Sequence, residues 1–157
     1  MNNLQNNRLS RFNYKQVVSE IDLQNMLLSE NEEFIPPLST SVNIEAWTKK
    51  LIKNAQFICC YFNNKLIGAV AIYCNNQETS RAHIPLVVIK KDYTNKGIAT
   101  NLINKALICA KEYNMQNVTI ETQSDKALRL YQKLNFVIVE KKQIDDRMLY
   151  LLEQPLR

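Results

Sequence analysis

The sequence predicts a single domain of the α/β class, more exactly α+β, over all 157 residues. Segments in which apolar residues recur with the period of a helix alternate with apolar runs typical of strands. These segments predict seven strands and four helices, in the order β-α-α-β-β-β-α-β-α-β-β. A chain of this length with 46% hydrophobic residues can bury one core without cross-links. Its two glycines and four prolines leave no linker at which it would divide. Only the polar segment 1–10 is expected to be disordered.

The first third of the chain predicts one strand and two helices. Residues 13–18 are typical of a strand, and residues 22–29 place apolar side chains at the i, i+3, i+4 spacing of a short helix that Asp22 would cap. Two prolines exclude regular structure in residues 35–39. Helical spacing resumes over residues 43–54.

The middle of the chain predicts a hairpin and a third strand. Residues 55–62 and 66–73 are apolar runs typical of strands. Asn63 and Asn64 separate them, and asparagine suits the positive φ angles of a tight hairpin turn. Residues 82–89 form the third run.

The second half predicts the longest helix, over residues 96–113, with an apolar face opposite a face of lysines and asparagines. A strand over 118–122 and a helix over 124–134 follow, and Ser124 is a good N-cap for that helix. Residues 136–142 and 148–152 form a closing hairpin around Asp145 and Asp146.

Charge and hydropathy limit the classes of partner that the sequence favours. The net charge is +5, but the cations are scattered along the chain, which favours an anionic small ligand over a nucleic acid. No stretch approaches the roughly 18 apolar residues of a membrane span, and the polar first residues do not resemble a secretory signal. We therefore expect a cytoplasmic protein with no membrane or nucleic-acid partner.

The four cysteines are Cys59, Cys60, Cys74 and Cys109, and all lie inside apolar runs. They show neither a CxxC pair nor the Cys/His spacing of a zinc site. The sequence thus predicts reduced, buried thiols and no metal.

The most informative segment is 87–102, in which a strand is followed by a short polar loop and a helix start. The first turn of a helix has N–H groups without intrahelical partners, and these favour an anion such as a diphosphate. Gly97 permits close approach, Lys96 adds a positive charge, and no acidic residue lies between Tyr93 and Lys111. On this spacing alone, an ordinary helix start with a small residue such as Ala99 is the alternative.

Two motifs, in the right order, resemble the GNAT acetyltransferases. Residues 94–99 resemble their Arg/Gln-x-x-Gly-x-Gly/Ala motif, and residues 127–136 resemble their Ala-x-x-Leu-Tyr-x-x-x-Gly-Phe segment. Thr94 and Asn135 depart from these motifs, although asparagine readily adopts the left-handed conformation of the usual glycine. The resemblance implies the GNAT fold, a mixed, mostly antiparallel sheet of six to seven strands flanked by about four helices. It also implies an acetyl-CoA-dependent N-acetyltransferase.

The resemblance assigns the donor-binding residues. Strand backbone would hold the pantetheine arm, and loop amides would hold the diphosphate. Ser124 stands where many members of the family have an asparagine, seven residues before the tyrosine. The splayed strands 82–89 and 118–122 would hold the thioester between them. These expected cofactor-binding residues are Val87, Val88 and Ile89, then Asn95, Lys96, Gly97, Ile98, Ala99 and Thr100, and finally Ser124.

The resemblance also assigns the proton transfers. Tyr131 stands where many members have a tyrosine that protonates the departing CoA thiolate, and its ordinary pKa near 10 suits that role. For the base, His83 falls where histone-type members have a glutamate, and strand alternation puts it on one face with Pro85 and Val87. Glu121 would act through water, and Glu78 is a more distant candidate. A solvated side chain without a catalytic role is the alternative for each base candidate.

The acceptor is less defined by sequence. The mechanism implied is direct attack by a primary amine. The loop 35–38 and the helix with Trp47 resemble GNAT enzymes of bacterial surface-sugar pathways, which favours an amino sugar, in particular a nucleotide-linked one. Protein N-termini, other small amines and a non-catalytic acyl-CoA sensor are the alternatives. Phe34 and Trp47 would line the acceptor pocket or belong to the core, and both a monomer and a homodimer are compatible with the sequence.

Overall fold

The computed structural model describes residues 12–157 and contains, within them, seven strands, four α-helices and three short 3-10 helices. The expectation of disorder in residues 1–10 concerns residues outside this described part. The elements are β1 (Phe12–Lys15), α2 (Glu20–Ser29), η1 (Asn31–Glu33), η2 (Leu38–Thr40), α3 (Ile44–Asn54), β2 (Gln56–Phe62), β3 (Lys65–Tyr73), β4 (Arg81–Ile89), η3 (Lys91–Tyr93), α4 (Ile98–Glu112), β5 (Asn117–Thr122), α5 (Asp125–Lys133), β6 (Val137–Ile144) and β7 (Arg147–Pro155).

The seven strands of this described part form one sheet in the order β1-β2-β3-β4-β5-β7-β6. The β4–β5 pair is parallel and the other pairs are antiparallel. This is the mixed, mostly antiparallel sheet with four helices that the sequence predicts.

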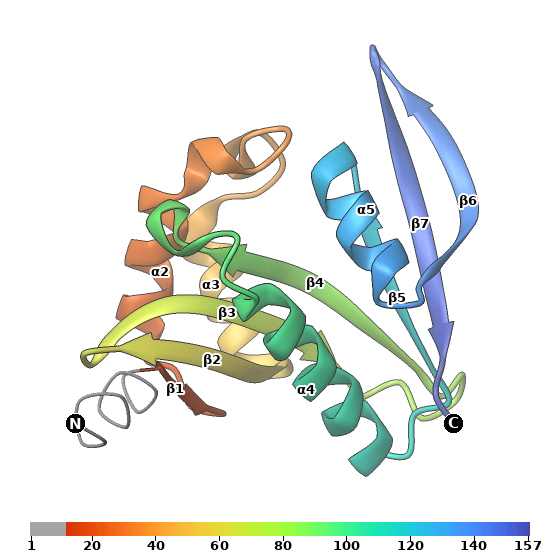
Figure 1. Cartoon of the computed structure of the whole chain (residues 1–157), viewed down its shortest axis with the longest axis horizontal. Coiled ribbons are helices and arrows are strands. Elements are labelled where there is room, and N and C mark those ends of the chain that lie inside the picture. The colour runs from red at the N-terminus through yellow and green to blue at the C-terminus, as the bar shows by residue number, and fades with distance from the viewer. Residues whose placement is uncertain (1–11) are drawn as a thin grey trace, which may run out of the picture.

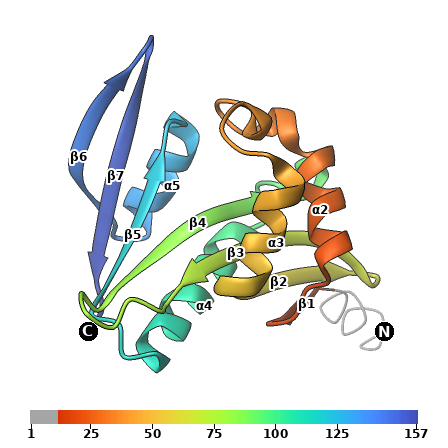
Figure 2. The ribbon, with the colours of Figure 1, turned by 180° about the vertical axis from the view of Figure 1, so that it is seen from behind.

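Helices cover both faces of the sheet (Figures 1 and 2). Helices α2 and α3 lie on one face, where Leu27 and Leu51 are fully buried. Helices α4 and α5 lie on the other face, where Leu102 and Phe136 belong to a second core cluster. The protein is therefore a three-layer structure with a core on each side of the sheet.

Strands β4 and β5 separate after a short paired stretch, and Figure 1 shows them diverging. They pair from Arg81 opposite Asn117 to Ile84 opposite Ile120, and no pairing follows beyond these four residues of each strand. The next residue of β4 is Pro85, which has no N–H to donate to a neighbouring strand. The sheet consequently opens between the ends of β4 and β5.

A β-bulge in β4 coincides with this opening. Ala71 of β3 pairs with Leu86, and Tyr73 pairs with His83, so that two residues of β4 oppose one residue of β3. The extra residue falls next to Pro85. A bulge of this kind shifts the alternation of side chains by one position.

The shift corrects one prediction. Ile84 belongs to the core on the α4 face, whereas Leu86 belongs to the core on the α2 and α3 face. His83, before the bulge, therefore faces the α2 and α3 side, while Val87, after the bulge, packs against the α4 side. The prediction that His83, Pro85 and Val87 share one face was wrong, because strict alternation fails at a bulge.

Local predictions hold where side-chain chemistry is specific. Asn63 and Asn64 have φ angles of 49° and 64°, as the predicted hairpin turn requires, and Ser124 caps α5. Helix α2 differs from the prediction. Its N-cap is Ser19, whose side chain accepts from the N–H of Asp22, so Asp22 lies in the first turn and the predicted cap was wrong.

The remaining composition-based expectations concern membranes, metals and thiols. Within residues 12–157, no helix has the length and apolar character needed to cross a membrane. In the same residues, no group of three His, Cys, Asp or Glu side chains has the arrangement of a metal site. The four cysteines are free and buried, as predicted.

Candidate active site

The opening between β4 and β5 contains a cavity of about 230 Å³. Four segments line it: the part of β4 around the bulge, the end of β5 with the turn after it, the first turns of α5, and the loop that follows α2. The lining residues are Ile84, Pro85, Leu86 and Val87, then Ile120, Glu121, Thr122 and Gln123, then Ser124, Ala127 and Tyr131, and finally Glu33, Phe34 and Ile35.

The edge of β4 beside this cavity offers free backbone groups. The N–H of Lys90 donates to the carbonyl of Ile67 in β3 at 2.8 Å. Because successive residues of a strand direct their N–H and C=O groups to opposite sides, Val88 faces β3. Val87 and Ile89 therefore direct theirs toward the side on which β5 has departed. Of the three predicted pantetheine contacts, these two have available backbone groups.

The start of α4 provides a second set of free N–H groups. Gly97 is the N-cap with φ 79°, and the N–H of Asn101 donates to its carbonyl at 3.1 Å. The N–H groups of Ile98, Ala99 and Thr100 consequently precede the first intrahelical bond. The first turn has no acidic residue, and a Cβ added at Gly97 would meet only open space. The predicted loop thus has the geometry of an anion site.

Tyr131 is almost completely buried, with 6% of its surface exposed, and it lines the cavity from α5. Its ring packs against Phe136 with centroids 6.2 Å apart. Burial raises the pKa of this phenol, so it is protonated at neutral pH.

Glu121 and His83 lie on the same face of the sheet but differ in access. Glu121 follows the last paired residue of β5, is exposed, and lines the cavity. His83 is half-buried, its Nδ1 lies 2.8 Å from Oγ1 of Thr119, and it does not line the cavity. Burial lowers the pKa of His83, and the Glu121 carboxylate partly opposes this shift. The structure therefore brings Tyr131 and Glu121 to one cavity and leaves His83 beside it.

The other residues predicted for the site differ in whether they line the cavity. The Ser124 hydroxyl lines the cavity but accepts from the N–H of Ala127 at 3.2 Å as the α5 cap. Phe34 lines the cavity, whereas Trp47 packs into the core beside α2 and α3 and does not. Glu78 is exposed in the turn before β4 and is not a lining residue.

Sequence reasoning named Phe34 of the loop after α2 as one candidate for the acceptor pocket but missed its lining neighbours Glu33 and Ile35. Nζ of Lys91 lies 3.7 Å from the Glu33 carboxylate. The signal available was the acidic run Glu30-Asn31-Glu32-Glu33, which lies two residues before two prolines. An irregular loop of this composition indicates a functional segment more often than a core segment.

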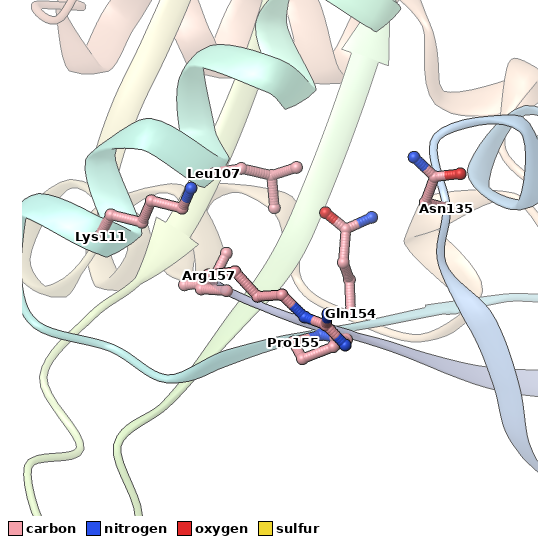
Figure 3. A pocket seen from close by; sticks show the side chains of 7 residues that line it. Leu107, Lys111, Asn135, Gln154, Pro155 and Arg157 are labelled. Atoms are coloured by element: carbon pink, nitrogen blue, oxygen red, sulfur yellow. The ribbon is translucent and has the colours of Figure 1, made fainter.

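A second cavity of about 400 Å³ lies between the end of α4 and the end of β7 (Figure 3). Figure 3 shows Leu107 and Lys111 of α4 on one side and Asn135 on the other, with Gln154 and Arg157 between them. No residue predicted as catalytic or cofactor-binding lines it. It is separate from the candidate active site.

Comparisons with known proteins agree with this geometry. A sequence model described as "Acetyltransferase (GNAT) domain" matches residues 9–151. The chain is 30% identical to N-alpha-acetyltransferase 50 of Danio rerio over 106 residues, which are 62% of this chain and 63% of that protein. It is 35% identical to streptothricin acetyltransferase A of Bacillus subtilis over 80 residues, which are 50% of this chain and 45% of that protein.

The match to these curated relatives thus spans less than two thirds of their length. Among solved structures, an acetyltransferase of the GNAT family from Staphylococcus aureus Mu50 superimposes with a TM-score of 0.74 and 17% identity. That match covers 93% of this chain and 99% of the other. The GNAT fold expected from the two motifs is confirmed.

Proposed function

Because this chain belongs to the GNAT acetyltransferase domain family, we propose that it transfers the acetyl group of acetyl-CoA to the nitrogen of an amine by direct attack. The observation that carries the proposal is the cavity between β4 and β5, which the nearly buried Tyr131 lines together with a strand edge that has free backbone groups. Such a cavity matches a reaction that needs an aligned thioester, a positioned proton donor and little water.

The donor would lie across the open edge of β4. The free groups of Val87 and Ile89 suit the amides of the pantetheine arm, which would extend the sheet by one strand. The first-turn amides of α4 and the Lys96 ammonium suit the diphosphate. Ser124 supports the site by capping α5, the helix that carries Tyr131.

Glu121 is the best-placed residue to accept the first proton. The acceptor arrives as an ammonium and must lose a proton before it can attack. Glu121 is exposed at the cavity wall, where it can take that proton directly or through water. His83 lies on the same face, and its neutral form can receive the proton in turn.

Bond making and breaking then follow in one site. The amine nitrogen attacks the thioester carbonyl carbon, and a backbone N–H on the open edge of β4 stabilises the negative charge on the carbonyl oxygen. Val87 is the free-edge residue that lines the cavity. The carbon–sulfur bond breaks, the CoA thiolate takes the proton of the Tyr131 hydroxyl, and the second proton that the amine nitrogen loses restores that hydroxyl. The products are an acetamide, CoA and one proton released to solvent.

The charges at the cavity favour a cationic acceptor without phosphates. The charged side chains that line it are two carboxylates, Glu33 and Glu121. A protein N-terminus or a small amine suits such walls, and relatives are named N-alpha-acetyltransferase 50 and streptothricin acetyltransferase A. An amino sugar also fits, whereas a nucleotide-linked amino sugar would bring its diphosphate toward carboxylates.

The proposal is tested by acetyl-CoA-dependent thiol release with a panel of diamines, monoamines, amino sugars, nucleotide-linked amino sugars and short peptides. Wild type is expected to release thiol only with an amine present. Tyr131→Phe keeps the ring but removes the proton, and should lower kcat by about a hundredfold with the acetyl-CoA affinity unchanged. Tight acetyl-CoA binding without release for any amine would instead indicate an acyl-CoA sensor.

A further inference from the structure

The second carboxylate of the cavity has no task in the reaction described above. Glu121 and Glu33 come from different segments, β5 and the loop after α2, and they line the same cavity. One carboxylate suffices to take the proton of the reacting ammonium. Glu33 is therefore available to recognise another part of the acceptor.

The Glu33 carboxylate already pairs with the ammonium group of a lysine. Nζ of Lys91 lies 3.7 Å from its Oε1, with the two side chains 75% and 48% exposed respectively. An ion pair this exposed contributes little stability, so a ligand can displace it. Lys91 belongs to η3, between β4 and the donor loop, and shows that a primary ammonium on an alkyl chain reaches this carboxylate.

Apolar side chains adjoin the two carboxylates in the cavity wall. Phe34 and Ile35 directly follow Glu33 and line the cavity, and Ile35 is 48% exposed despite being apolar. The nearly buried Tyr131 lines the same cavity. The site thus combines a reaction position, an apolar wall and a second carboxylate. Methylene groups bind such a wall favourably.

We propose that the acceptor is a linear diamine or a related dication, and that Glu33 is the residue that selects it. One amine is acetylated beside Tyr131 while the other, as an ammonium, displaces Lys91 from the Glu33 carboxylate. This inference rests on the proposed acetyltransferase function and specifies its substrate class. Glu33 acts on binding of the acceptor and takes no part in the proton transfers.

The test compares kcat/KM for α,ω-diamines of graded length with monoamines of matched length. Wild type is expected to prefer one diamine over its matched monoamine by about tenfold, because the second ammonium gains a charged partner. Glu33→Gln should remove this preference, mainly by raising KM for the diamine, and should change kcat/KM for the monoamines much less. Glu32→Gln is the matched control, since Glu32 lies in the same loop and does not line the cavity. Lys91→Met should lower KM for the diamine by removing the competing ammonium.

Two outcomes overturn the inference in distinguishable ways. Equal use of diamines and monoamines, a preference for peptides, or a diamine preference that survives in Glu33→Gln would reject the diamine and leave the acetyltransferase standing. Absence of transfer to every amine would reject both.

Discussion

Tyr131 and Glu121 reach one cavity from different elements, and their surroundings differ. Tyr131 is nearly buried, which raises the pKa of its phenol and keeps the proton that the thiolate would take. Glu121 is exposed, so it can exchange a proton with water. The residue types were predictable from the family motifs. Glu33 was not, because no motif covers the loop after α2.

His83 is the single histidine of the chain, so the pH dependence of the free energy of unfolding can test its surroundings. Its burial lowers its pKa in the folded protein below the value of about 6.5 in the unfolded chain. Below that pH the unfolded state binds more protons, so stability is present above about pH 6.5 and is lost as the pH falls. His83→Gln should therefore flatten the fall in unfolding free energy between about pH 7 and pH 5.

Urea unfolding of wild type and His83→Gln at several pH values measures this difference. Both proteins have the same carboxylates, so the contribution of these groups cancels in the comparison. Parallel curves for the two proteins would contradict the assignment of His83 as a neutral, half-buried side chain.

Helix α4 shows how one element end combines structure and ligand binding. A glycine N-cap without a side-chain hydrogen bond and a first turn without acidic residues leave the helix start poorly capped. Such a start costs stability that an acidic side chain would restore. The free amides of this helix start remain available for an anionic ligand, and we expect this binding role to explain why the start is poorly capped.

Thr100→Glu separates these two contributions. The added carboxylate should raise the unfolding free energy of the free protein by about 0.5 kcal/mol through the helix dipole. The same charge should weaken acetyl-CoA binding by about tenfold or more through repulsion of the diphosphate. Thr100→Gln is the neutral control with similar helix propensity. Calorimetric titration that finds equal affinity for the two variants would contradict a diphosphate at this helix start.

Across elements, predictions from sequence succeeded where the determinant is local. The asparagine turn between β2 and β3 and the serine cap of α5 depend on residues a few positions apart. Asn135, in place of the family glycine, has the predicted left-handed backbone with φ 73°. The prediction of where α2 begins failed because Ser19 and Asp22 are both good N-cap residues, and the local sequence pattern does not choose between them.

At the scale of the whole molecule, function depends on a sheet that is joined in its middle by four residue pairs and then opens. This opening could be expected only through the family resemblance, because strand register is set by long-range pairing that one sequence does not display. The bulge beside Pro85 was not predicted, and it reversed the face assigned to Val87. The loop after α2 reaches the cavity through tertiary packing, so the sequence connected residues 34–38 with the acceptor only loosely and did not point to Glu33 at all.

The most direct test of acetyl transfer in this cavity follows an isotopically labelled acetyl group from acetyl-CoA through one turnover, with a diamine as acceptor and mass spectrometry of all products. The account predicts that the label appears in the acetamide of the amine, in amounts equal to the free CoA, and that Tyr131→Phe slows its appearance. Label bound to a cysteine of the protein, or released as acetate, would contradict direct attack by the amine.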